Sequence, residues 1–203
     1  MNRRNFLGLL ASALPIGACT SNNVSMQTIS TAIETSLGNA AAFDPDYPDK
    51  LPYASIAVKL PGIAKALLVL GKVEGDELHW ISADRSVLVT QHGRIIRTVG
   101  LASNLAKTEL RDQDFLQPGE NITTQPAATT RVVDLLPGNR YGLKITSTIE
   151  RLGPESIQIG QRTYQTTKVA EHCVVDRNAW SFTNTYWLDS NNIAWKSIQH
   201  ITP

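Results

Sequence analysis

The sequence predicts an all-β domain that follows an export signal. Short runs of β-branched and aromatic residues recur from Tyr53 to the C-terminus, separated by turn residues. The N-terminus instead carries two arginines and an apolar stretch. The composition is that of an ordinary globular chain, with 203 residues of which 42% are hydrophobic and 18% charged. We expect residues 53–203 to form a single antiparallel meander, as a curved sheet, a half-barrel or a sandwich.

The charge balance excludes one class of partner. The chain has 19 basic and 18 acidic residues, a formal net charge of +1. Nucleic-acid-binding domains carry a clear excess of positive charge. We therefore expect no nucleic-acid partner.

Residues 1–18 have the layout of a secretory signal. Arg3 and Arg4 precede the apolar stretch Phe6–Ile16, and Gly17-Ala18 stand directly before Cys19. The stretch is shorter than the roughly 20 residues that span a bilayer. Ile16-Gly17-Ala18-Cys19 resembles the bacterial lipobox, which implies that Cys19 carries acyl chains such as palmitate and is the first mature residue. The alternative is a plain signal peptide with an incidental cysteine.

The signal also suggests a destination and a route. An aspartate after the lipobox cysteine usually retains a Gram-negative lipoprotein in the inner membrane, whereas this chain has Thr20. That implies the outer membrane, with the body facing the periplasm. The segment Asn2–Leu7, with Arg3 and Arg4, resembles a twin-arginine signal but departs from it at the first and last positions. An ordinary basic start for a Sec signal therefore remains an open alternative.

Residues 19–52 are expected to tether the domain. A polar stretch, Ser21–Ser25, comes first. Four apolar residues at spacings of three or four then predict an amphipathic helix of about three turns that covers the sheet and ends at Gly38: Met26, Ile29, Ile33 and Leu37. The prolines in Phe43–Pro52 exclude regular structure. The aspartates of this segment (Asp44, Asp46, Asp49) fit no EF-hand spacing.

Two early hairpins follow from turn chemistry. Gly75 suits a type II′ turn that pairs Val73 with Leu78, Leu70 with Ile81 and Gly71 with Trp80. His92-Gly93 suits a turn that pairs Thr90 with Ile95 and Val89 with Ile96. The run Leu67–Leu70 is apolar on both faces, which predicts a central strand covered on both sides.

The C-terminal hairpin contains three of the four tryptophans. A turn at Ser190-Asn191 pairs Leu188 with Ile193 and Tyr186 with Trp195 on the core face. Trp187 then lies on the opposite face and is the first candidate for contact with a ligand, with Trp80 as a second candidate. The alternative is that another layer covers Trp187, because tryptophan is usually well buried.

Several separated blocks resemble the YjbF/GfcB lipoprotein family. They are Pro52–Val58, Ala66–Gly71, Leu78–Asp84, Arg94–Leu101 and Asn184–Asp189 with Trp195-Lys196-Ser197. The resemblance runs from about Tyr53 to the C-terminus. It implies an outer-membrane lipoprotein of exopolysaccharide or group 4 capsule gene clusters, with a curved antiparallel sheet and no transferable catalytic residue.

A search for catalytic and metal-binding motifs gives no strong candidate. The four histidines lack metal-ligand spacing, and we find no G-x-S-x-G, P-loop or H-E-x-x-H motif. Cys173 neighbours His172 in a strand, where adjacent side chains point to opposite faces. Cys173 is therefore expected to be a small buried hydrophobe. We expect no enzyme activity, no catalytic residue, no metal and no cofactor.

Three functions remain open from the sequence. The leading hypothesis is a non-enzymatic lipoprotein that supports export or assembly of an extracellular polysaccharide by binding the glycan or a component of the secretion apparatus. The second is a lipid or lipoprotein carrier with an apolar concave sheet. The third is a glycan-modifying enzyme with two converging carboxylates, for which the unranked candidates are Asp84, Glu109, Asp134 and Glu171.

Overall fold

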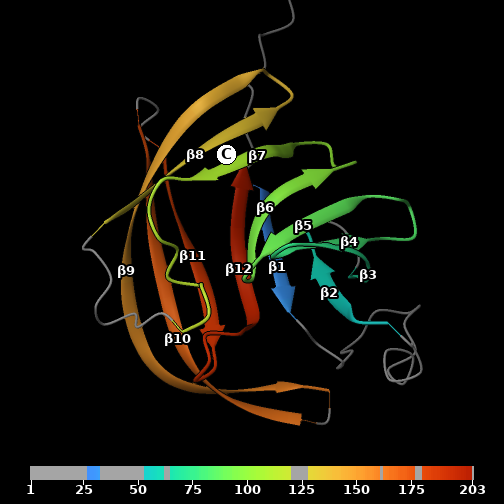
Figure 1. Cartoon of the computed structure of the whole chain (residues 1–203), viewed down its shortest axis with the longest axis vertical. Coiled ribbons are helices and arrows are strands. Elements are labelled where there is room, and N and C mark those ends of the chain that lie inside the picture. Colours follow the sequence, from blue (N-terminus) through green and yellow to red (C-terminus); the bar gives the residue numbers. More distant parts are fainter. Residues whose placement is uncertain are drawn as a thin grey trace, which may run out of the picture.

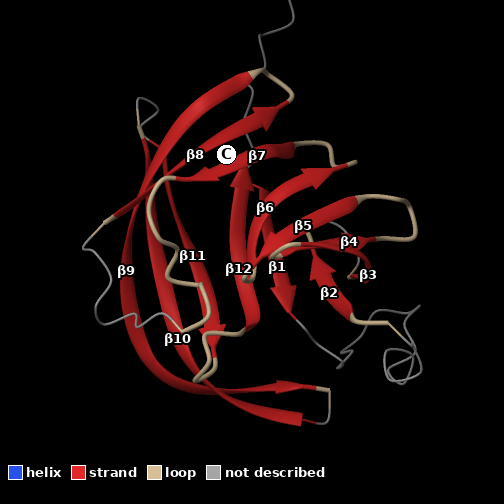
Figure 2. Ribbon diagram, in the orientation of Figure 1, coloured by secondary structure: helices blue, strands red, loops and turns tan. Residues whose placement is uncertain are grey.

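The computed structural model of this chain describes residues 27–32, 53–61, 65–119, 128–160, 162–176 and 180–202. Strands account for most of these residues, and no helix occurs among them (Figure 1, Figure 2). The same residues therefore contain no helix that could cross a membrane. The strands are β1 (Gln27–Ala32), β2 (Ser55–Lys59), β3 (Ala66–Glu74), β4 (Glu77–Ile81), β5 (Val87–Gln91), β6 (Arg94–Val99), β7 (Asn104–Leu110), β8 (Thr129–Leu136), β9 (Arg140–Ile159), β10 (Arg162–Val175), β11 (Trp180–Leu188) and β12 (Ala194–Thr202).

All of these strands belong to one antiparallel sheet, in the order β6-β5-β4-β3-β2-β1-β12-β11-β10-β9-β8-β7. Consecutive strands are neighbours within each half, and β1 joins the halves by pairing with β12. Each half curls around its own concave side, so that the two edge strands, β6 and β7, lie close to each other (Figure 1). The predicted all-β, curved antiparallel meander is therefore confirmed.

Strand β1 corrects the predicted N-terminal helix. Gln27–Ala32 are extended and pair with β12 on one side and with β2 on the other. Thr28, Ile29 and Thr31 are β-branched and favour extended backbone. Two flanking strands also offer this segment backbone hydrogen bonds, which outweigh a weak helical spacing. The rest of the predicted helix and the proline-rich segment lie outside the described residues.

The β3–β4 hairpin has the predicted turn but a different register. Gly75 has a φ of +58°, and Val73 pairs with Leu78 as expected. Leu70, however, pairs with Trp80 and not with Ile81, because a bulge at Gly71 inserts one residue. A Cβ at Gly71 would collide with the Ile81 side chain, so Ile81, and not Trp80, covers this glycine.

The β5–β6 hairpin also has the predicted turn and a register that differs from the prediction in part. His92 and Gly93 both have positive φ, and Thr90 pairs with Ile95 as predicted. A bulge then pairs Val89 with Arg97 in place of Ile96.

Strand β3 is central, but its second face is not fully covered, since Leu68 is buried whereas Leu67 and Val69 are half-buried.

The concave sides of the two halves share one hydrophobic core. Its buried members are Ile56, Val58, Leu68, Trp80, Leu88, Ile95, Leu105, Val133, Leu135, Ile145, Cys173, Val175, Phe182 and Ile201. A second cluster lies outside this core, where the strongly curved β9–β10 hairpin packs its distal part over β11 and β12 (Figure 1). There Ile157 and Ile159 cover Trp187, which is 4% exposed.

Side chains satisfy backbone groups where the two sheet edges meet. The Gln199 side chain, from β12, accepts from the Ile95 amide at 2.9 Å and donates to the Gly93 carbonyl at 2.8 Å. The Thr98 hydroxyl, on β6, accepts from the Leu105 amide, on β7, at 2.9 Å. Unpaired edge groups are otherwise costly when buried. These side chains therefore let the curled sheet bring its edges together without a regular ladder between β6 and β7.

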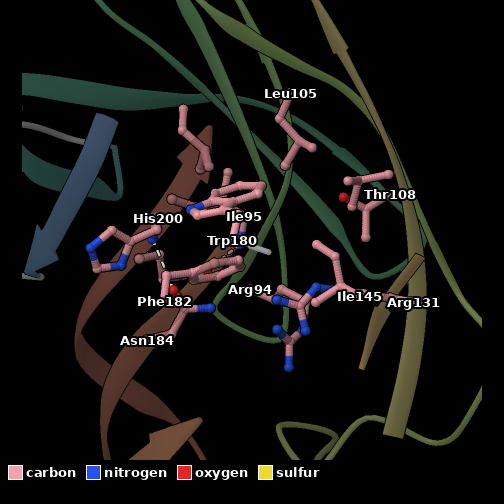
Figure 3. A pocket seen from close by; sticks show the side chains of 13 residues that line it. Arg94, Ile95, Leu105, Thr108, Arg131, Ile145, Trp180, Phe182, Asn184 and His200 are labelled. Carbon is pink, nitrogen blue, oxygen red and sulfur yellow. Dashed lines mark hydrogen bonds between the residues drawn. The ribbon is translucent and has the colours of Figure 1, made fainter. Parts of the chain in front are cut away.

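A buried cluster of charges links the same edge to the second half of the sheet. The Arg94 guanidinium, from β6, donates to Asp114 at 2.6 and 2.8 Å and to Glu171, on β10, at 3.0 and 3.1 Å. Arg131, from β8, also donates to Glu171, at 2.6 Å. Figure 3 shows the two guanidinium groups side by side. Two positive and two negative groups make the cluster neutral, as burial requires.

The cluster determines how the buried groups titrate. Burial alone raises the pKa of Glu171, but Arg131 and Arg94 outweigh it and hold this pKa well below its ordinary value of 4.5. Burial also raises the pKa of the Cys173 thiol to about 11, with the Glu171 charge acting in the same direction. Cys173 is 1% exposed, so the prediction of a small buried residue is confirmed. Its neighbour His172 is exposed on the other face, as predicted.

We predict that Glu171→Gln lowers the free energy of unfolding by about 3–5 kcal/mol, because it leaves a buried positive charge without its partner. Urea unfolding at pH 7, followed by tryptophan fluorescence, measures this change. Glu150→Gln is the matched control. Glu150 is exposed on β9 and pairs with His172 at 2.9 Å, so its loss should cost no more than about 1 kcal/mol. Equal midpoints for the two variants would contradict the prediction.

The low pKa of Glu171 also predicts an acid dependence. A carboxylate with a depressed folded-state pKa stabilises the fold above its unfolded pKa, here about 4.5, and this contribution is lost as the pH falls toward the folded value. The wild-type advantage over Glu171→Gln should be constant above about pH 5.5 and smaller by about 2 kcal/mol at pH 3. Urea unfolding of both proteins across this range provides the test, and a pH-independent difference would refute it.

Candidate ligand-binding cleft

A cleft of about 420 Å³ opens where four connections of the sheet meet. The β3–β4 turn, the β5–β6 turn, the loop after β7 and the β11–β12 turn surround it. The residues that line it are Ile56, Gly75, Asp76, Leu78, Trp80, Thr90, His92, Gly93, Leu116, Pro118, Asn192, Ile193, Ala194, Trp195 and Ser197. Its volume falls in the range of about 300–1,000 Å³ that is typical of small-molecule sites.

Local sequence chemistry fixes the β11–β12 turn at the rim. The Asp189 carboxylate accepts from the Asn191 and Ile193 amides at 2.8 and 3.0 Å, as in an Asx-type turn. Asn192 has a φ of +64°, which asparagine tolerates, and its side chain donates to two carbonyls of the loop after β7. These hydrogen bonds join two rims of the cleft.

Two tryptophan side chains contribute to the lining. Trp80 lies at the floor, 6% exposed, and its indole N–H donates to the Thr90 hydroxyl at 2.9 Å. Trp195 is half-buried, and its N–H donates to Asp189 at 2.9 Å. The Trp195 ring also packs against the Tyr164 ring, with 4.0 Å between centroids and an angle of 33° between the ring planes. Both rings are therefore held in fixed orientations before any ligand binds.

The lining is mostly apolar, with polar groups near the rim. Asp76 is the one carboxylate, and Lys and Arg are absent, among the described residues that line the cleft. The Asp76 carboxylate lies 3.6 Å from His92 Nε2. Such a site offers apolar surface to a flat ligand and a few hydrogen-bonding groups at its edge.

The interior pocket shown in Figure 3 is not a second ligand site of this size. It is lined by Arg94, Arg131, Asn184 and the stacked rings of Trp180 and Phe182, among others. Its free volume is about 20 Å³, which is room for about one water molecule. The buried Thr108 hydroxyl and Trp180 N–H in its lining have no hydrogen-bond partner. We therefore take the cleft as the candidate functional site.

The structure corrects one of the two tryptophan predictions. Trp187 is buried beneath the β9–β10 hairpin, with the Lys168 and Lys196 ammonium groups 5.1 and 4.6 Å from its ring centroid. The expectation that this ring stays free for a ligand is therefore wrong, and the alternative of a covering layer holds. Trp80 is also buried, but it forms part of the cleft floor.

The remaining predicted residues do not converge on the cleft. Asp84 caps the β4–β5 turn through Ser82 and Ser86, and Asp134 accepts from the Gly142 amide. Glu109 pairs with basic neighbours at the surface, and Glu171 is in the buried cluster. None of these four candidate carboxylates lines the cleft. Cys19, Arg3 and Arg4 lie outside the described residues.

Sequence reasoning missed Trp195 because of the register. Leu188 pairs with Ala194 and Trp187 with Lys196, so Trp195 is the extra residue of a bulge. The predicted pairing of Tyr186 with Trp195 placed this ring in the core, whereas the bulge turns it toward the cleft and the β9–β10 hairpin. The Asp189 carboxylate accepts from the Asn191 and Ile193 amides in the adjoining turn, but the residue types themselves do not indicate the bulge.

Known proteins share part of this sequence. Two relatives from Escherichia coli (strain K12) are "Uncharacterized lipoprotein GfcB", 28% identical over 140 residues, and "Uncharacterized lipoprotein YjbF", 25% identical over 153 residues. The matches cover 69% and 74% of this chain, and 65% and 70% of the relatives. The chain thus spans slightly less than two thirds of GfcB.

A solved structure shares the fold. The hypothetical lipoprotein YmcC from Escherichia coli (K12) superposes with a TM-score of 0.67, at 23% identity, over 78% of this chain and 88% of that one. The sequence profile of the family described as "Group 4 capsule polysaccharide lipoprotein gfcB, YjbF" matches residues 26–203. The chain therefore belongs to the YjbF/GfcB family of group 4 capsule polysaccharide lipoproteins.

Proposed function

We propose that this chain is a non-enzymatic lipoprotein, anchored in the outer membrane through Cys19 and facing the periplasm, that supports export or assembly of an extracellular polysaccharide. In this proposal the protein binds a short stretch of the polymer in the cleft between the β3–β4 and β11–β12 turns. Binding a component of the secretion apparatus is the other mode of action consistent with family membership.

The character of the cleft is the observation that carries this proposal. Sugar rings present apolar C–H faces to aromatic rings and hydroxyl groups at their edges. The cleft matches this pattern, since Trp80, Trp195 and Ile193 supply apolar surface and the rim supplies Asp76 and Asn192. Asp76 is also its only carboxylate among the described residues, whereas glycoside hydrolysis ordinarily uses a pair. These features favour binding over hydrolysis.

The length of the segment before β1 is consistent with a membrane-anchored domain, and the cavities of the domain argue against a lipid carrier. From Cys19 to the first residue of β1, Gln27, the chain can span at most about 29 Å, which would keep the domain near the membrane. An acyl-chain carrier needs an enclosed apolar cavity. The interior pocket has room for about one water molecule, and the larger cleft is not enclosed, since Asp76 and Ile193 at its rim are exposed.

We predict that deletion of the gene lowers the amount of polysaccharide at the cell surface and that Ile193→Asp fails to restore it. Ile193 is 46% exposed and lines the cleft, so the added charge should reduce polymer binding without disturbing the core. A carbohydrate assay of the surface fraction measures the polymer, with membrane immunoblots to confirm equal protein levels. Ile193→Val is the control and should restore surface polysaccharide fully. Undiminished surface polymer in the deletion strain would overturn the proposal.

A further inference from the structure

We propose that the cleft selects uncharged sugar residues of the polymer and disfavours acidic ones. This inference rests on the proposed function and adds the chemical class of the ligand. It concerns the part of the glycan that contacts Trp195, Ile193 and Asp76, whatever the composition of the remainder of the chain.

The charge of the cleft is the first observation. Asp76 is the one group of fixed charge among the described lining residues, and its side chain is 67% exposed at the rim. A uronate or another anionic substituent would meet this like charge, and neither a lysine nor an arginine among the described lining residues, where the His92 ring faces Asp76 at 3.6 Å. Proteins that bind anionic groups ordinarily present arginine or lysine to them. A sugar hydroxyl can instead donate to the Asp76 carboxylate.

Three basic residues of the neighbouring strands make contacts away from the cleft. Arg94 is buried and contacts Asp114 and Glu171. Lys72 pairs with Glu74 at 2.7 Å at the surface. Lys196, next to Trp195 in the chain, places its ammonium over the Trp187 ring, in the cluster beneath the β9–β10 hairpin. The cleft therefore draws no positive charge from these three side chains.

The apolar lining is the second observation. Ile56, Leu78, Leu116 and Ile193 join the two tryptophans around the space. Apolar walls suit the C–H faces of neutral sugars and the methyl groups of deoxy or N-acetyl sugars. Apolar walls offer no hydrogen bonds to replace the water molecules that a carboxylate loses on binding, so binding a carboxylate there is unfavourable. Lining and charge thus point to the same class of ligand.

The test uses the full lipidated protein in detergent and fragments of the extracellular polysaccharide of the producing strain. Calorimetry compares native fragments with fragments whose carboxylates have been reduced to alcohols, at 20 and 500 mM NaCl (about 20 and 4 Å of screening length). We expect the reduced fragments to bind more tightly than the native ones, by up to about tenfold, because the native fragments bring a like charge near Asp76. For the reduced fragments, we also expect the affinity to differ by less than about twofold between 20 and 500 mM NaCl.

A charge reversal sharpens the test. Asp76→Lys adds a cation at an exposed turn position and should shift the preference toward native acidic fragments. Glu150→Lys makes the same change at an exposed site on β9, away from the cleft lining, and should leave the preference unchanged. If the wild-type protein binds native fragments as tightly as reduced ones or more tightly, or if native fragments lose affinity at high salt, this inference alone is overturned. Absence of binding to every fragment would overturn the proposed function as well.

Discussion

The contact of Arg94 with Asp114 and Glu171 is the interaction on which the arrangement of the two half-sheets depends. It reaches from the edge strand β6 across to β10, and its members are buried. Ion pairs of this kind contribute little net stability compared with well-packed apolar residues, but they are costly to break. The cluster therefore acts as a specific constraint. The β6 edge can dock only where Arg94 meets Asp114 and Glu171, because any other position would leave buried charges unpaired.

The position of the cleft follows from this constraint. The β5–β6 turn, with His92 and Gly93, directly precedes Arg94 in the chain, so the contact that holds Arg94 also holds one rim. Gln199 fixes the same turn by donating to the Gly93 carbonyl. Asn192 ties the β11–β12 turn to the loop that carries Asp114 and Leu116. Turns thus form the rim of the candidate site, and the contacts of Arg94, Gln199 and Asn192 fix the positions of these turns relative to one another.

Sequence reasoning reached the fold class and the turns but not the bulges. Gly75 and His92-Gly93 indicate their turns in the sequence, because these turns need positive φ and glycine readily adopts it. The bulges near Gly71, Ile96 and Trp195 leave no comparable signal, and each one shifts which side chains face each other. Strand β1 was missed for a related reason, because its partners come from distant parts of the chain. Glu171 was only one of four unranked carboxylates, although it alternates with Val169 and Cys173 in the sequence, and only the fold reveals Arg94 and Arg131 as its partners.

A crystal structure of the protein grown with a fragment of its own extracellular polysaccharide tests the proposed binding site most directly. We expect a sugar ring in the cleft, against Trp195 and Ile193 and within hydrogen-bonding distance of Asp76. A ring bound on the outer face of the sheet or over another turn would contradict it.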